Sequence, residues 1–205
     1  MKIFVVTNDT HILKPGGAQE EIYSFCRHLT ELGHETTLVT LNTPNQKSAA
    51  LEVARRESQV PVVAIDAAPE SLGRWLSRCL AEPSFFDRPA YLMQRLVETR
   101  AWEAAVQERK PDLVVGFCSF SWPVMADAKR RGLRTLFRSH NYDPDFFMET
   151  IEPAERLHPA NWVRYVGKYF SERRAARWAD HIAATPLREI ALYERWTGRP
   201  ATVMQ

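Results

Sequence analysis

The sequence lacks the features that would place the protein in several special classes. No apolar run approaches the roughly 20 residues that cross a membrane, and the apolar start at residues 3–6 is too short for the core of a secretion signal. The sequence contains no internal repeat and no low-complexity linker. A net charge of +2 is too small to indicate nucleic-acid binding. These absences favour a cytoplasmic globular protein that does not bind nucleic acid.

Cysteine is scarce. Cys26, Cys79 and Cys118 lie far apart and match neither a zinc-binding spacing nor an even set for disulfides, so we expect reduced, buried thiols. The remaining composition is ordinary, with 45% hydrophobic and 25% charged residues. A chain of 205 residues buries roughly 70% of its unfolded surface and is long enough for one large domain.

The first 33 residues form the most informative unit. The apolar run Ile3–Val6 is typical of a strand covered on both faces. Apolar residues then recur at helical spacing over residues 19–32, and Gly33 ends this helix before a second strand at residues 36–41. A strand, a helix and a second strand predict the opening unit of a parallel α/β sheet.

Gly16 and Gly17 lie in the loop between the first strand and the first helix. Without a Cβ they let an anionic ligand approach main-chain N–H groups, and the helix directs its positive end to the same point. A phosphate or a sugar carboxylate would be stabilised there; alternatively, the pair only makes a tight turn. The spacing G-x-G-x-x-G and the Lys-Ser/Thr of a P-loop are both missing, so we expect no dinucleotide or ATP cofactor.

Strands and helices alternate along the rest of the chain, which predicts a doubly wound parallel sheet. The expected elements are a helix at 49–56, a strand at 60–65 with Pro61 at its end or at a sheet edge, a helical excursion within 67–89, a helix at 91–107, a strand at 112–117, a helix at 122–131, a strand at 134–138, a helix at 161–178, a strand at 181–184, a helix at 187–196 and an apolar fragment at 201–204. Ligands bind such sheets outside the carboxyl ends of the strands, which selects the loops 8–17, 118–121 and 139–145.

Two of these loops carry polar side chains suited to chemistry. His140 and Asn141 follow the strand 134–138, and a histidine there can hydrogen-bond a sugar hydroxyl or act as a base, or it can merely cap the loop. Asp143 and Asp145 could hold Mg²⁺, but we favour a contact with acceptor hydroxyls over a metal site. Alternatively, Asp145 with Phe146 and Phe147 simply starts a helix. Ser119 is a further candidate substrate contact.

The helix at 161–178 allows two interpretations. Trp162, Tyr165, Val166 and Tyr169 recur at helical spacing, with arginine and lysine around the remainder. The stripe either packs into the core beneath a solvated basic face or makes a peripheral contact at the inner face of a membrane.

Three segments resemble the N-terminal domain of the GT-B glycosyltransferases of family 4. They are KPGGAQEEIYSFCRHLTELGHETTLVT near the start, RSHNYDPDFF at Arg138–Phe147 and ADHIAATP at Ala179–Pro186. The resemblance covers nearly the whole chain and is loosest over residues 45–98. It implies the Rossmann-like, acceptor-side half of a GT-B enzyme over residues 1–205, followed in the family by a second, nucleotide-sugar-binding domain. We therefore expect a truncated form or half of an enzyme, nearly inactive alone.

The activity that this resemblance implies is retaining, metal-independent transfer of a sugar from a nucleotide-sugar donor to a glycan or a lipid-linked acceptor, as in polysaccharide biosynthesis. His140 matches the histidine that contacts the donor sugar and the reacting phosphate oxygen. Gly16 and Gly17 would approach the donor diphosphate, and Ser119, Asn141 and Asp143 would contact substrate. The alternatives are a stand-alone module that binds a glycan or an anion without turnover, and a different Rossmann-like enzyme, which the missing glycine motif disfavours.

Overall fold

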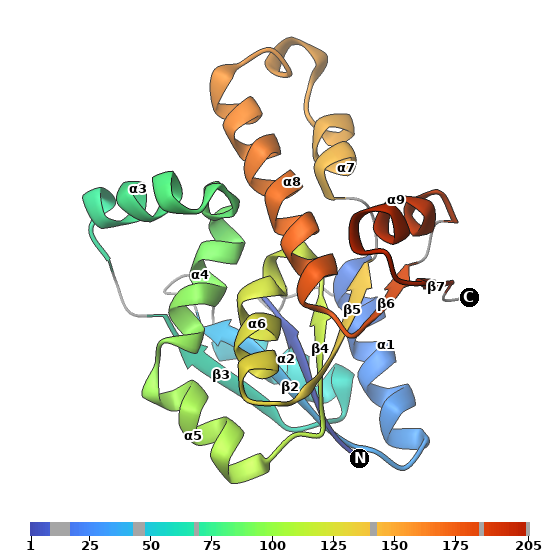
Figure 1. The fold of residues 1–205 in the computed structure, drawn as a ribbon. Coiled ribbons are helices and arrows are strands. Elements are labelled where there is room, and N and C mark those ends of the chain that lie inside the picture. The colour runs from blue at the N-terminus through green and yellow to red at the C-terminus, as the bar shows by residue number, and fades with distance from the viewer. Residues whose placement is uncertain (9–16, 43–47, 68–69, 140–142, 185–186, 204–205) are drawn as a thin grey trace.

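The structure is a computed structural model that describes residues 1–8, 17–42, 48–67, 70–139, 143–184 and 187–203. Within these residues, seven parallel strands form one sheet in the order β3-β2-β1-β4-β5-β6-β7 (Figure 1). The strands are β1 (Lys2–Thr7), β2 (Glu35–Asn42), β3 (Val62–Asp66), β4 (Leu113–Phe117), β5 (Arg134–Ser139), β6 (His181–Ala184) and β7 (Thr202–Val203). The helices are α1 (Ala18–Glu31), α2 (Ser48–Ser58), α3 (Leu72–Ala81), α4 (Arg88–Val97), α5 (Arg100–Arg109), α6 (Trp122–Arg130), α7 (Asp143–Thr150), α8 (Pro159–Trp178) and α9 (Leu187–Thr197), with 3₁₀ segments at Pro83–Phe86, Ser119–Ser121 and Pro153–Glu155.

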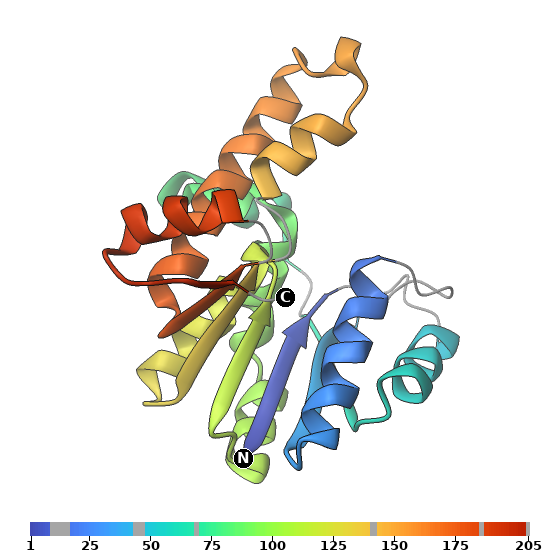
Figure 2. The same cartoon turned by 90° about the vertical axis from the view of Figure 1, so that its right-hand side faces the viewer.

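Helices cover both faces of the sheet, with α1 and α2 on one face and α4, α5, α6 and α8 on the other (Figure 2). Alternate residues of β1 serve the two cores: Ile3 and Val5 pack toward α1 and α2, whereas Phe4 and Val6 pack toward the other helices. All four side chains are buried, which explains why this strand reads as a continuous apolar run. The predicted doubly wound α/β fold is confirmed.

Most predicted elements are present with small shifts at their ends. Pro61 directly precedes the edge strand β3, where its carbonyl accepts a hydrogen bond from the N–H of Leu38 at 2.9 Å. The prediction of a single helix over 91–107 is wrong, because two separate helices, α4 and α5, occupy this range. Thr99 causes the break: its hydroxyl oxygen accepts from the N–H of Trp102 at 3.1 Å and so begins α5 as an N-cap.

Helix α8 is the longest helix in the described residues, and its N-terminal half projects with α7 beyond the carboxyl edge of the sheet (Figures 1 and 2). Gly167 seats it on the 3₁₀ segment Pro83–Phe86, since a Cβ there would lie 2.6 Å from the carbonyl carbon of Phe86. The core interpretation of the stripe is wrong in the projecting half, where Trp162 and Val166 are exposed. The core forms further along the helix, at Ala175 and Ala176.

Candidate functional site

The order of the strands reverses between β1 and β4. The chain adds β2 and β3 on one side of β1, and then β4 to β7 on the other side. In open α/β sheets, ligands bind outside the carboxyl ends of the strands at such a reversal. In this protein that position lies at the ends of β1, β4 and β5, beneath the projecting helices α7 and α8 (Figure 1).

Gly17 begins α1 beside the end of β1. Its backbone has φ 52° and ψ −115°, a conformation that residues with a Cβ avoid. Its carbonyl accepts the first helical hydrogen bond, from the N–H of Glu21 at 3.2 Å. A Cβ at Gly17 would meet no described atom within 4 Å. Gly17 therefore permits the turn that leads into the positive end of α1.

A strained turn follows β4. Cys118 has φ 63° and ψ 163°, a region occupied almost entirely by glycine. Its N–H donates to the carbonyl of Arg138 at 3.2 Å, and its carbonyl accepts from the hydroxyl of Ser121 at 2.7 Å. Ser121 folds back over Gly116, where a Cβ would collide with its Oγ. Strain of this kind occurs at functional sites, in agreement with the position of the turn at the strand reversal.

Arg138, near the end of β5, crosses the sheet toward α1. Its guanidinium forms an ion pair with Glu21, with Nε 3.1 Å from Oε1 of the carboxylate. The guanidinium carbon also lies 5.0 Å from the ring centre of Phe25 and 5.1 Å from that of Phe117, as in cation–π contacts. The arginine is buried, so this pair ties β4 and β5 to the first turn of α1.

Ser139, the next residue, faces the opposite core and joins a buried polar network. Its hydroxyl lies 2.7 Å from that of Tyr193 and donates to Glu189 at 3.1 Å, both on α9. Tyr193 in turn donates to Glu172 of α8. Burial, reinforced by the nearby Glu172, raises the pKa of Tyr193 far above its usual value, so its hydroxyl keeps its proton. The network joins α8 and α9 to the end of β5.

The comparisons with known proteins identify the family. The family described as "Glycosyl transferase 4-like domain" matches residues 16–205. The chain belongs to this family. No curated protein sequence matches the chain significantly.

Solved structures confirm the fold of this glycosyltransferase 4-like domain. Sucrose-phosphate synthase from Thermosynechococcus elongatus matches with a TM-score of 0.61 and 15% identity over 99% of this chain and 47% of that chain. UGT71G1 of Medicago truncatula, solved with UDP-glucose, matches with a TM-score of 0.62 and 12% identity over 98% of this chain and 50% of that one. UGT2 of Phytolacca americana matches with a TM-score of 0.56 and 13% identity over 98% and 51%. The chain thus spans about half the length of the structures it matches.

The structure places some of the predicted site residues of the glycosyltransferase 4-like domain. Gly16, His140 and Asn141 lie outside the described residues. Gly17 and Ser119 follow neighbouring strands at the reversal, but Ser119 is fully buried, so its contact with substrate stays a prediction. Asp143 is the first residue of α7, so a helix is present at this motif, and it starts before Asp145, where the sequence alternative placed its start.

The functional candidates that sequence reasoning missed are Glu21, Glu172, Glu189 and Tyr193, together with the roles of Arg138 and Ser139. One signal was available: a charged residue directly after the apolar strand core Leu136–Phe137 needs a partner if it is buried. Among the described residues, no group of three or more His, Cys, Asp or Glu side chains is placed to hold a metal ion. No helix in the described part of the chain is long and apolar enough to span a bilayer.

Proposed function

We propose that this chain is the acceptor-side half of a retaining glycosyltransferase, which moves a sugar from a nucleotide-sugar donor to a hydroxyl of a glycan or a lipid-linked acceptor. The match of residues 16–205 to the glycosyl transferase 4-like family carries the proposal. The strand reversal, with Gly17 and α1 at its edge, supports it, because the end of a helix can stabilise the charge that develops on a leaving diphosphate.

In this proposal the loop after β5 supplies the reacting groups. His140 contacts the donor sugar and the reacting phosphate oxygen, while Asn141, Asp143 and Ser119 contact substrate. Gly16 and Gly17 approach the donor diphosphate. The last residues of β5, which the Arg138–Glu21 pair and the Ser139 network hold from opposite faces, support this arrangement because they fix where that loop begins. Catalysis arises mainly from positioning and from charge stabilisation, with no metal ion.

We further propose that a second α/β domain completes the donor site, in line with the half-length coverage of the matched structures. A cytoplasmic location and a role in polysaccharide biosynthesis belong to the same proposal. The single-domain chain would then retain few of the contacts to the donor base and ribose.

Calorimetry with UDP- and dTDP-sugars tests whether the contacts to the donor base and ribose lie on a second domain. We expect the 205-residue chain to bind them no more tightly than about millimolar, which is roughly 4 kcal/mol of binding free energy. Sugar transfer should appear when the chain is joined to a nucleotide-binding domain of the family. Micromolar binding by the chain alone, without transfer in the joined protein, would indicate a stand-alone binding module instead.

A further inference from the structure

One face of α8 changes from apolar to basic along its length. The spacing of residues 162, 166, 170, 173 and 177 places them on one stripe of the helix. At the projecting end, Trp162, Val163 and Val166 are 47%, 43% and 39% exposed. At the other end the stripe continues as Arg173 and Arg177. Exposed apolar side chains grouped at a projecting tip are unusual for a surface that faces only water.

Helix α3 carries a second exposed apolar stripe. Leu72, Leu76 and Leu80 recur every four residues and are 68%, 44% and 82% exposed. On the side that faces the protein, α3 packs through the buried Cys79 and through Trp75. The ring of Trp75 meets that of Phe86 edge-on, with 6.5 Å between the ring centres. The leucines therefore stay outside the packed core even though the core lies beside them.

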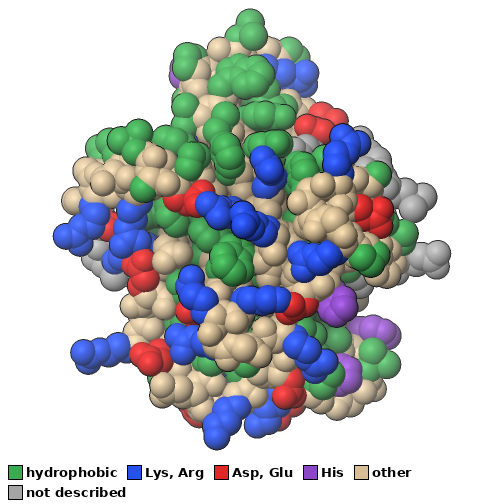
Figure 3. Space-filling view, in the orientation of Figure 1, with side chains coloured by type: hydrophobic (Ala, Val, Ile, Leu, Met, Phe, Trp, Pro, Cys, Tyr) green, Lys and Arg blue, Asp and Glu red, His purple; other side chains and the backbone are tan. Residues whose placement is uncertain are grey.

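The apolar surfaces of α3 and α8 lie on one side of the molecule. Figure 3 shows hydrophobic side chains along α3 and over the projecting end of α8, with lysine and arginine gathered below them. We call these two stripes, with the arginines of α8, the apolar–basic face. Neither helix adds exposed negative charge: α3 contains no acidic residue, and Glu172, the one acidic residue of α8, is buried.

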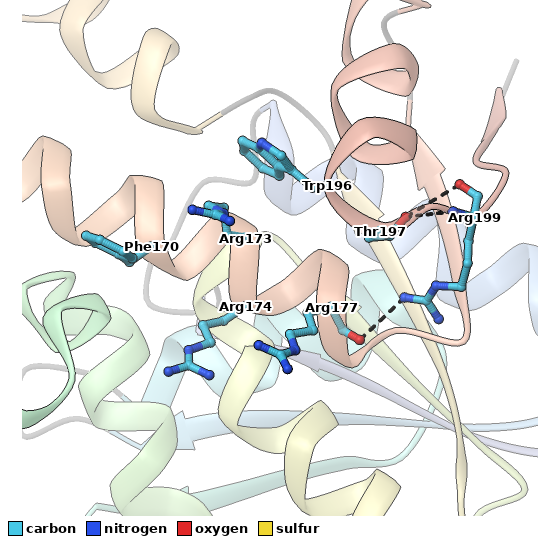
Figure 4. Close-up of a pocket in the computed structure, with 7 residues that line it drawn as sticks. All are labelled: Phe170, Arg173, Arg174, Arg177, Trp196, Thr197 and Arg199. Atoms are coloured by element: carbon cyan, nitrogen blue, oxygen red, sulfur yellow. Dashed lines mark hydrogen bonds between the residues drawn. The ribbon is translucent and has the colours of Figure 1, made fainter.

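The basic end of this face is hollowed. A cavity of about 470 Å³ lies between α8 and the end of α9, lined by Phe170, Arg173, Arg174, Arg177, Trp196, Thr197 and Arg199 (Figure 4). Arg199 is held on the last turn of α8, where it donates to the carbonyl of Ala176 at 2.9 Å. Arg174 forms an ion pair with Glu82. The lining keeps excess positive charge, which suits phosphate groups.

We propose that the apolar–basic face docks on the surface of an anionic phospholipid membrane. Trp162, Val166 and the α3 leucines enter the boundary between headgroups and acyl chains, as the apolar side of an interfacial helix does. Arg173 and Arg177 follow Val166 by 7 and 11 residues, or about 10 and 16 Å along the helix, so an inclined α8 brings them to the lipid phosphates. The charge of the face selects an anionic bilayer over a neutral one.

This docking goes beyond the proposed function and does not depend on it. It would hold the carboxyl edge of the sheet close to the bilayer, because the same helices α7 and α8 project over that edge. Only one corollary rests on the proposed function: an acceptor hydroxyl at the membrane surface would be within reach of the site.

Vesicle co-sedimentation of the full chain tests the docking without donor or acceptor. The probes are phosphatidylcholine vesicles and vesicles that also contain about 30% phosphatidylglycerol, at low and high salt. We expect binding to the anionic vesicles that weakens with salt. Leu72→Ser/Leu76→Ser/Leu80→Ser and Trp162→Ser/Val166→Ser should each weaken it about ten-fold or more. Arg173→Gln/Arg177→Gln should weaken it about ten-fold and remove most of the preference for anionic lipid.

Matched controls come from the opposite face of the sheet. Leu32→Ser removes a leucine that is 60% exposed after α1, and Arg55→Gln/Arg56→Gln removes two exposed charges of α2. Both should bind within about two-fold of wild type, since neither lies on the docking face. Equal binding to neutral and anionic vesicles, no binding, or wild-type binding by the face variants would overturn the proposal. Sedimentation equilibrium provides a further test. The proposal would also be overturned if the apolar–basic face mediated self-association or bound a nucleotide-binding domain instead.

Discussion

Two neighbouring residues of β5, Arg138 and Ser139, point to opposite faces of the sheet and are held by different kinds of interaction. Arg138 is fixed by charge, through Glu21 and two aromatic rings on the α1 side. Ser139 is fixed by hydrogen bonds to carboxyl and hydroxyl groups on the α8 and α9 side. The contrast shows that the end of β5 is clamped from both cores, by helices from the two ends of the chain. The end of β5 is therefore a fixed point from which the chain continues.

The Arg138–Glu21 ion pair should contribute more to the free energy of unfolding than the Ser139 network does. The change Glu21→Gln removes the Glu21 carboxylate from the guanidinium of Arg138, whose side chain is only 10% exposed. We therefore expect a loss of about 3 kcal/mol in the free energy of unfolding. Urea denaturation measures this loss. Glu20→Gln, an exposed neighbour in the same turn, is the control and should stay within about 0.5 kcal/mol. Equal effects of the two changes would mean that the pair does not hold α1 to β5.

The Ser139 side depends on where α8 sits. In Gly167→Ala the new methyl group would collide with backbone atoms of Phe86 and Asp87, so we expect a loss of about 2 kcal/mol or more in urea denaturation. Gly73→Ala in α3 is the matched control, because a Cβ there meets no described atom within 4 Å. That control should stabilise the protein by up to about 1 kcal/mol through helix propensity. A harmless Gly167→Ala would contradict the close seat of α8.

Alkaline pH should lower the free energy of unfolding through the buried thiol of Cys26, which lies on α1. Burial raises the pKa of this thiol to about 12 in the folded protein, against roughly 8.5 in the unfolded chain. The protonated folded form is therefore fully favoured below pH ~8.5, and its advantage is lost as the pH rises toward 12, at about 1.4 kcal/mol per unit. Denaturation between about pH 8 and 10 should show an extra loss of ~2 kcal/mol in wild type that Cys26→Ala lacks. Parallel profiles would show that the thiol is not buried as described.

The smallest effect should come from the Ser139 network. Tyr193→Phe removes the hydroxyl that bonds both Ser139 and Glu172, so we expect a loss of about 1 kcal/mol. Tyr165→Phe in α8, where the ring is half-buried, is the control and should change stability by less than ~0.5 kcal/mol. If Tyr193→Phe cost as much as Glu21→Gln, the two sides of the clamp would contribute equally.

The fold could be predicted where local patterns decide the structure. The strand β6 has the predicted bounds, β1 contains the predicted run Ile3–Val6, and Gly33 and Gly132, both at positive φ, follow helices that end within one residue of the expected position. The break between α4 and α5 was missed because the apolar pattern continues across it, while the hydroxyl of Thr99 decides the local structure. The exposure of Trp162 could not be predicted, because helical spacing shows that side chains share a face and does not show what covers it.

The candidate site could be predicted in position but not in its supporting contacts. The rule for strand ends selected the loops that contain the turns at Gly17 and Cys118, and both turns lie beside the strand reversal. Glu172 and Glu189 were missed because carboxylates in amphipathic helices normally face water, and only the packing of α8 against α9 buries them. Long-range pairs such as Arg138–Glu21, 117 residues apart, have no local signal in one sequence.

The central claim, that the loop after β5 carries sugar transfer, is tested most directly at His140. The measurement is the turnover of the chain joined to a nucleotide-binding domain of the family, for wild type and His140→Ala, with the melting temperature recorded alongside. The account predicts a loss of roughly 10²-fold or more in turnover, the scale of one lost transition-state hydrogen bond, with stability within about 0.5 kcal/mol of wild type. A folded His140→Ala protein that transfers sugar at the wild-type rate would contradict it.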